Sequence, residues 1–177
     1  MRKKSKKRNK MIGVALVIIV LLFGIITVKF IQYEKIIEDT ERTWLITQYG
    51  PRDVNSMFYT LYGGKGQLIV VDGGWTEDAD FVRQTIKEMG GKVDAWILTH
   101  PHQDHIGAFN AIYSDLQGIE IKEVYTVDMP SPKLCQERAH WDSVDTYNDF
   151  LDLNVKNLKY VYPGDELNIC GLKVECL

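Results

Sequence analysis

Histidine and cysteine are both scarce in this 177-residue chain, which contains four histidines and three cysteines. The cysteines, Cys135, Cys170 and Cys176, lack the paired close spacing that is typical of a structural zinc site. Cys170 and Cys176 are compatible with one disulfide in an oxidising compartment, but free thiols are the simpler interpretation. No internal repeat is visible in the sequence.

Basic residues are also scarce once the first few residues are passed. Residues 2–10 carry seven Lys and Arg and no acid, whereas the chain from Gln32 onward has 13 Lys and Arg against 24 Asp and Glu. An acidic body does not attract polyanions over long range, which argues against a generic nucleic-acid-binding surface. A bound metal ion can still reverse the sign of the potential inside one cleft.

Charge is absent from residues 11–28, an apolar run that is long enough to cross a membrane. A cleaved signal peptide is the alternative, but its apolar region is usually only ~7–15 residues long and ends in small residues. Here Lys29, Phe30 and Ile31 follow, so an uncleaved anchor is favoured. The sequence predicts a basic cytoplasmic tail at 1–10, a single-pass transmembrane anchor at 11–31, a polar spacer at 32–43 and a domain at 44–177 outside the cell membrane.

The remaining residues have the alternating apolar patterns of a folded α/β domain. We expect strands at 44–49, 56–62, 67–71, 93–99, 119–127, 158–162, 166–169 and 172–176. Helices are expected after Thr76, which is a candidate N-cap, from 106 to 116, and from 144 to 153 with Ser143 as the cap. Residues 128–141 read as irregular. This order predicts a mixed sheet whose helices cover one face.

Three of the four histidines lie in the segment His100-Pro101-His102-Gln103-Asp104-His105, between a predicted strand and a predicted helix. The end of a strand is a favoured place for a ligand site in α/β proteins. In an extended segment His100 and His102 point to the same side, where both can bind one metal ion. Asp104 and His105 begin the helix and can reach a second ion.

Other interpretations exist for each residue taken singly. An isolated Asp at the start of a helix is usually a cap, and a lone His is usually a core or surface residue. Imidazole and carboxylate are, however, the usual ligands of zinc, and four of them within six residues favour a metal site. Two-metal sites hold their ions roughly 3.5–4 Å apart and lower the pKa of a bound water to ~7. The expected chemistry is hydrolysis of an ester, amide or phosphodiester.

The segment Thr99–Ala108 resembles the His-x-His-x-Asp-His signature of the metallo-β-lactamase superfamily, and Val71-Asp72-Gly73-Gly74 resembles its Asp-Gly motif at a strand end. The resemblance implies an α/β fold, a partial αββα sandwich over residues 44–177, with the site at the edge between two mixed sheets. It also implies two divalent metal ions, zinc in the first place, with manganese or iron as alternatives.

The same resemblance assigns roles to individual residues. His100 and His102 would bind the first ion, and Asp104 and His105 the second, with Asp104 also the expected catalytic carboxylate. Asp72 would orient the ligand loop from behind; forming a turn is its alternative role. A histidine after Asp104 resembles the hydrolase, glyoxalase and nuclease branches of the superfamily. The anchored arrangement resembles domains of competence-type DNA-uptake proteins and surface-anchored relatives in Gram-positive bacteria.

Members of this superfamily need a further His, a bridging Asp and a last His from later strands. Only His140 follows the cluster here, and its polar surroundings fit a loop better than a ligand position. We therefore expect a truncated chain that binds metal weakly. The predicted function is a metal-dependent hydrolase with a small-molecule or phosphodiester substrate and no evident protein partner. The alternative is a catalytically incomplete, membrane-anchored binding or scaffold protein.

Overall fold

The computed structural model describes residues 2–50 and 57–177 and divides the chain into two compact units, Met1–Thr43 and Trp44–Leu177. The first unit contains one continuous helix, α1 (Arg2–Glu41), which includes the expected tail, anchor and most of the spacer. The side chains of residues 1–17, 39 and 41 lie outside the described part. Within the described residues no helix is long and apolar enough to cross a membrane, and the transmembrane anchor at 11–31 stays a prediction.

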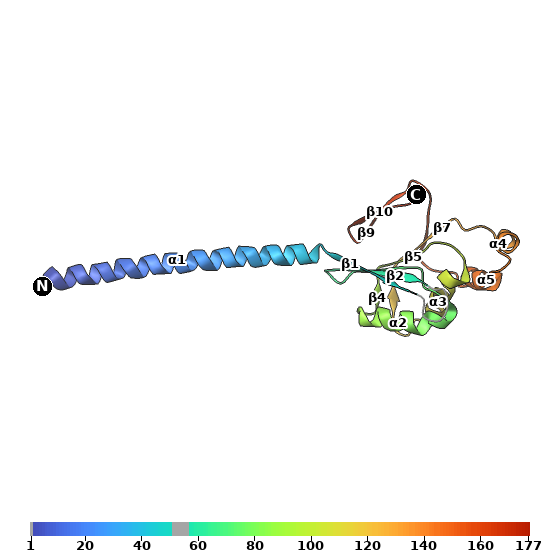
Figure 1. Cartoon of the computed structure of the whole chain (residues 1–177), viewed down its shortest axis with the longest axis horizontal. Helices are drawn as coiled ribbons and strands as arrows, with labels where there is room; N and C mark the ends of the chain where they lie inside the picture. The colour runs from blue at the N-terminus through green and yellow to red at the C-terminus, as the bar shows by residue number, and fades with distance from the viewer. Residues whose placement is uncertain (1, 51–56) are drawn as a thin grey trace. The chain divides into compact units, whose positions relative to one another are not determined.

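The second unit is built on a six-stranded sheet with the order β1-β2-β3-β5-β7-β8 (Figure 1). Its strands are β1 (Trp44–Tyr49), β2 (Phe58–Gly63), β3 (Leu68–Val71), β5 (Ala95–Leu98), β7 (Val124–Val127) and β8 (Leu158–Val161). Neighbouring strands are antiparallel from β1 to β3. The expected glycine turn connects β2 to β3, and Gly66 in this turn has φ 81°. The strands β3, β5, β7 and β8 run parallel to one another.

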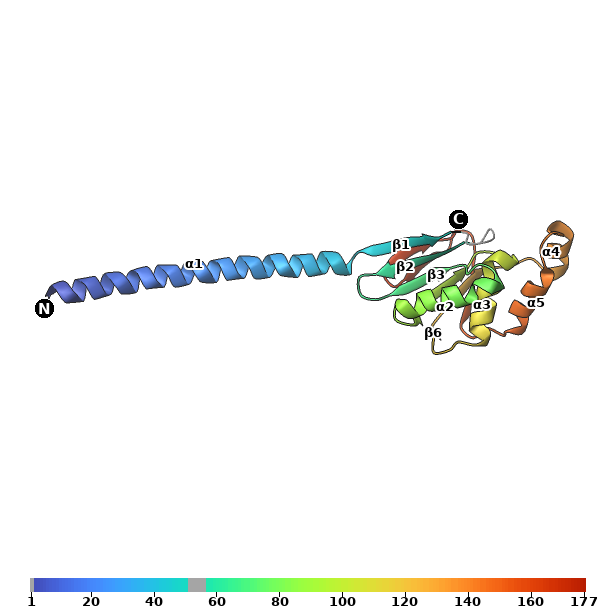
Figure 2. The ribbon, with the colours of Figure 1, turned by 60° about the horizontal axis from the view of Figure 1, so that its bottom comes forward.

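Parallel strands need crossover connections, and helices supply them. The helices α2 (Ala79–Glu88), α3 (Gln103–Ser114) and α5 (Val144–Asp152) lie on one face of the sheet (Figures 1 and 2). Val82 and Ile86 of α2 and Phe109 of α3 are almost fully buried there against Trp96 of β5. Burying one such side chain stabilises the fold by about 1.5–3 kcal/mol. The predicted mixed sheet with helices on one face is confirmed.

The opposite face of the sheet has a thinner cover. The strands β9 (Glu166–Ile169) and β10 (Leu172–Glu175) form an antiparallel hairpin on that side (Figure 1). Ile169 of the hairpin packs with Ile69, Tyr125 and Val161 of the sheet in a second apolar cluster. Within the described residues the second layer is therefore this two-stranded hairpin.

Two predicted strands are each divided in the structure. The 93–99 segment separates into β4 (Lys92–Val93) and β5, and the 119–127 segment into β6 (Glu120–Ile121) and β7. Asp94 interrupts the first, because its carboxylate accepts a hydrogen bond from the backbone N–H of Leu68. β4 and β6 then pair with each other in a separate parallel ladder. Ser56, where a strand was expected to begin, lies outside the described residues.

The predicted helix ends were partly wrong. Thr76 does not cap α2: residues Thr76–Asp78 form a short 3-10 turn, η1, and Asp78 is the residue before α2. The segment expected to be irregular contains a short helix, α4 (Pro132–Arg138), whose cap is Ser131. The cap predicted at Ser143 is confirmed, since its hydroxyl accepts from the N–H of Asp145. All three cysteines are free thiols.

Candidate functional site

The histidine-rich segment lies where β5 ends and α3 begins, as the sequence predicts. His102 has an extended backbone (φ −70°, ψ 147°) and occupies the N-cap position of α3. Asp104 is in the first helical turn, where the helix dipole favours a negative charge. It is therefore not the cap, and its side chain remains available for another role.

The three imidazoles of the segment are packed together. The ring centroids of His100 and His102 are 4.7 Å apart, and those of His100 and His105 are 3.8 Å apart. The Oδ2 atom of Asp104 lies 3.6 Å from Nε2 of His105. All four side chains are partly exposed, so solvent and small ligands can reach them. The structure thus brings together the four residues that the sequence predicted as metal ligands.

Asp72 lies directly behind this cluster. It follows β3, is only 5% exposed and has a left-handed backbone (φ 57°), a conformation that Asp adopts more readily than most residues. Its carboxylate accepts hydrogen bonds from the N–H of Thr99 at 2.9 Å and from the Thr99 hydroxyl at 2.8 Å. Its Oδ2 is also 2.8 Å from Nδ1 of His105. One buried carboxylate therefore connects the residue before His100 with the first turn of α3.

Further contacts fix the strand end that carries Asp72. The indole N–H of Trp96 donates to the backbone carbonyl of Asp72 at 2.9 Å. A Cβ at Gly73 would stand 3.1 Å from the backbone N of Phe109, so α3 packs closely on this strand end. Glycine is the residue that permits such an approach. The ligand segment is thus supported by a buried and tightly packed part of the fold.

The histidines differ in their electrostatic surroundings. Burial lowers the pKa of His100, and the neighbouring His105 and His102 lower it further. Burial also lowers the pKa of His105, but the hydrogen bond to Asp72 and the charges of Asp72, Asp104 and Asp142 outweigh it, so the pKa of His105 is raised. These effects favour the neutral form of the His100 imidazole, which is the form that binds metal ions in proteins.

Imidazole and carboxylate groups are suitable donors for an ion such as zinc. One pair of them, Asp104 and His105, also has a suitable spacing. Two donors that share one tetrahedral ion at about 2.0–2.1 Å lie roughly 3.3 Å from each other. The 3.6 Å between Asp104 and His105 is close to that value. However, among residues 2–50 and 57–177 no group of three or more His, Cys, Asp or Glu side chains has an arrangement that would hold a metal ion. The cluster therefore offers suitable donors, of which one pair is already well spaced.

One residue outside the cluster, Asp142, contacts the start of α3, and the sequence did not predict this contact. Both carboxylate oxygens of Asp142 lie 3.4 Å from the backbone N of Gln103, the first residue of α3. No local spacing signals this contact, because the two residues are 39 positions apart in the sequence. His140, the fourth histidine of the chain, is exposed, and its ring centroid lies 5.2 Å from that of Trp141.

A mixed sheet with a histidine and aspartate cluster at a strand end is the arrangement that the sequence motif implied, and comparison with known proteins agrees. Residues 49–134 match the family model of the metallo-beta-lactamase superfamily. Residues 49–134 of the Trp44–Leu177 unit are therefore similar to domains of that superfamily.

The curated relatives are hydrolases. The hydroxyacylglutathione hydrolase of Aliivibrio fischeri (strain MJ11) is 29% identical over 121 residues, which cover 66% of this chain and 46% of that enzyme. The enzyme of the same description from Photobacterium profundum is 28% identical over 131 residues, covering 72% and 50%. The chain thus spans about half the length of the curated relatives it matches.

The crystal structure of a metallo-beta-lactamase from Staphylococcus aureus subsp. aureus COL has a TM-score of 0.48 and 12% identity, over 76% of this chain and 34% of that one. A similarity of this degree does not bear on activity.

Proposed function

We propose that this chain carries part of the centre of a metal-dependent hydrolase. The observation that supports the proposal best is the contact between Asp72 and His105, at the edge of a cluster of three imidazoles and one carboxylate. Such a carboxylate behind a histidine is the usual support for a metal ligand. When bound, divalent ions would supply an activated water and stabilise the charge that develops on the attacked group.

The residues of this chain would have distinct tasks. His100 and His102 would hold one ion, and Asp104 and His105 the other. Because the carboxylate of Asp72 accepts from Nδ1 of His105, Nδ1 keeps the proton and the lone pair of Nε2 is free for the ion. Asp104 would face the reacting water from the first turn of α3, as the carboxylate expected to take part in catalysis.

For the substrate we propose an acyl ester before a phosphodiester. The relatives are named for a hydroxyacyl compound of glutathione, which is an acyl substrate. The acidic body of the chain is also a poor attractor for a polyanionic substrate at long range. Zinc is the expected metal, with manganese and iron as alternatives.

The test uses full-length protein and the matched pair His102→Ala and His140→Ala. Both remove one partly or fully exposed imidazole, but only His102 belongs to the cluster. Metal content after dialysis against zinc is measured by mass spectrometry, and turnover is measured with p-nitrophenyl acetate and bis(p-nitrophenyl) phosphate. We expect zinc in the wild type and in His140→Ala, a clear loss in His102→Ala, and a preference for the acetate ester.

A second candidate function is a metal-binding or scaffold protein without turnover. It is favoured by the spacing of Asp104 and His105, whose 3.6 Å separation fits a shared ion but supplies only two donors. Zinc binding that depends on His102, with no hydrolysis of either substrate, supports this candidate. Zinc content that is equal in both variants contradicts the assignment of the cluster altogether.

A further inference from the structure

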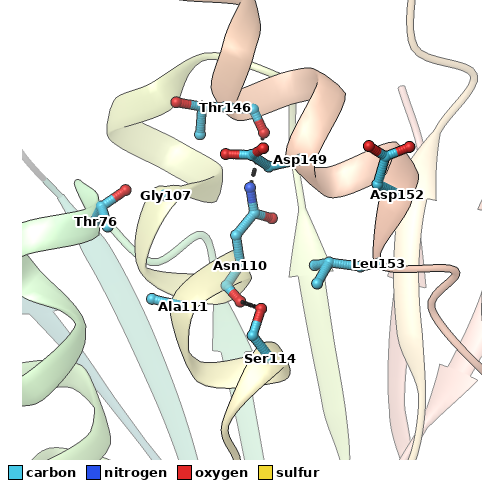
Figure 3. A pocket seen from close by; sticks show the side chains of 9 residues that line it. All are labelled: Thr76, Gly107, Asn110, Ala111, Ser114, Thr146, Asp149, Asp152 and Leu153. Carbon is cyan, nitrogen blue, oxygen red and sulfur yellow. Dashed lines mark hydrogen bonds between the residues drawn. The ribbon is translucent and has the colours of Figure 1, made fainter.

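A pocket of about 350 Å³ lies between α3 and α5, beside the η1 turn (Figure 3). It is lined by Thr76, Gly107, Asn110, Ala111, Ser114, Thr146, Asp149, Asp152 and Leu153. None of the four expected metal ligands is among these residues. Its volume is at the lower end of the range for small-molecule sites, roughly 300–1,000 Å³. The pocket is therefore large enough for a small organic ligand.

The pocket carries negative charge that its own wall does not neutralise. Asp149 and Asp152 both come from α5, and no Lys, Arg or His is among the lining residues. In Figure 3 their carboxylates lie along the α5 side of the pocket. Two carboxylates without a basic neighbour in the wall favour a cationic ligand over a neutral or anionic one.

Asn110 adds an independent observation. Its side chain, on a residue only 8% exposed, extends from α3 toward α5 (Figure 3), and its Nδ2 donates to the backbone carbonyl of Thr146 at 2.8 Å. The Oδ1 atom of the same amide has no hydrogen-bond partner among the described residues. Leaving a buried acceptor unpaired costs about 1–3 kcal/mol. This oxygen has almost no solvent-accessible surface, so a ligand N–H in the pocket removes that cost only when the Asn110 amide shifts toward the ligand.

The rest of the wall is apolar or small. Ala111 of α3 and Leu153, the residue after α5, face the same space as Asn110 (Figure 3). A bare divalent ion gains nothing from such surfaces, because it prefers oxygen ligands on all sides. An aliphatic chain does gain from them, by the burial of apolar area.

From the charge, the unpaired acceptor and the apolar wall together, we propose that this pocket binds a small aliphatic ammonium compound. Its ammonium group would lie between the carboxylates of Asp149 and Asp152 and, after a shift of the enclosed Asn110 amide toward the pocket, donate to Oδ1 of that residue. Its carbon chain would lie along Ala111 and Leu153. The site is separate from the histidine cluster, and the proposal holds whether or not the chain is a hydrolase.

The test is isothermal titration calorimetry of the full-length protein with 1,4-diaminobutane, with 1-butanol as the neutral probe and calcium as the metal probe. The charge variant is Asp149→Asn combined with Asp152→Asn, and the matched control is Asp145→Asn, an exposed position of α5 outside the pocket. A steric variant, Ala111→Leu, fills the pocket without altering its charge. Circular dichroism melts establish that each variant is folded.

We expect saturable binding of the diamine to the wild type and to Asp145→Asn, and none of 1-butanol. Each carboxylate should contribute up to about fivefold in affinity, since exposed ion pairs contribute up to ~1 kcal/mol, so the double variant should bind about 25-fold more weakly. Ala111→Leu should also lose binding. Diamine binding that is equal in the double variant and the control overturns the proposal. So does calcium binding in the absence of any diamine binding.

Discussion

Replacing Asp72 by Asn tests whether this buried carboxylate organises the ligand segment. Asn has nearly the same shape and tolerates the left-handed backbone found at this position, so the change isolates the charge and one acceptor oxygen. The oxygen that accepts from the N–H of Thr99 is retained. The second acceptor, which faces the Thr99 hydroxyl and Nδ1 of His105, is replaced by a donor.

The expected loss of stability follows from these contacts. Hydrogen bonds to a charged group contribute about 1.5–3 kcal/mol each, and the variant loses one fully and weakens another. We therefore expect the free energy of unfolding of the metal-free protein to fall by about 2–3 kcal/mol. For a domain of this size that corresponds to a decrease in Tm of roughly 8–10 °C. If the cluster binds zinc, the affinity should fall by about 10- to 100-fold as well.

The effect on stability should depend on pH, because the pKa of His105 is raised in the folded protein. A histidine with a raised pKa contributes stability that is complete below its unfolded pKa and is lost as the pH rises through the folded pKa. The window therefore lies above the unfolded value of 6.5. In the variant, burial remains while the Asp72 charge is gone, so the pKa of His105 falls. The difference in free energy of unfolding between the wild type and Asp72→Asn should therefore shrink from pH 6 to pH 8.

Thermal denaturation at several pH values and NMR titration of the His105 ring measure both effects. Asp145→Asn, at an exposed position, is the control and should change stability by no more than about 0.5 kcal/mol. A variant that melts with the wild type, or in which the pKa of His105 is unchanged, would refute the role assigned to Asp72.

Four further predictions concern other parts of the chain. In Gly107→Ala the new Cβ would stand 2.5 Å from a backbone nitrogen of η1, so we expect a loss of about 1–3 kcal/mol in a denaturant titration, although alanine normally favours a helix. Ser143→Ala removes the cap of α5 and should cost about 1 kcal/mol in the same assay. Asp142→Asn removes a charge that raises the pKa of His105, so NMR titration should find that pKa lowered; an unchanged value contradicts the placement of the segment after α4. Carbonate extraction tests the anchor expected at 11–31: protein released into the supernatant ends that hypothesis, and protein retained in the pellet supports it.

Periodic patterns predicted most of the fold, because burial against a sheet selects them directly. The helix stripe of Val82 and Ile86 and the continuous apolar runs of β3 and β5 are visible without tertiary information. Where tertiary contacts decide, the prediction was wrong. Thr76 looks like a cap, yet α3 packs so closely at Gly107 that the chain forms a 3-10 turn there first. Asp94 interrupts a strand by bonding to β3, a contact that no local pattern shows.

The candidate site divides in the same way. His100, His102, Asp104 and His105 could be identified because they are close in sequence, and closeness along a strand end and the following turn brings side chains together in space. Nothing local distinguishes Asp142, which lies near α3 only because α5 packs on that helix.

Asp72 lies between these two groups, because its role could be predicted from a sequence motif but not from its neighbours in the sequence alone. From the residues alone it fits a turn as well as a support for ligands. Its geometry now joins both roles, since a left-handed backbone turns the chain and directs the carboxylate at Thr99 and His105. Such a conformation in a buried residue is costly unless its contacts repay it. Thr99 precedes His100 in the sequence and His105 follows His102, and both bond to Asp72. These two contacts explain why one residue both forms the turn and supports the site.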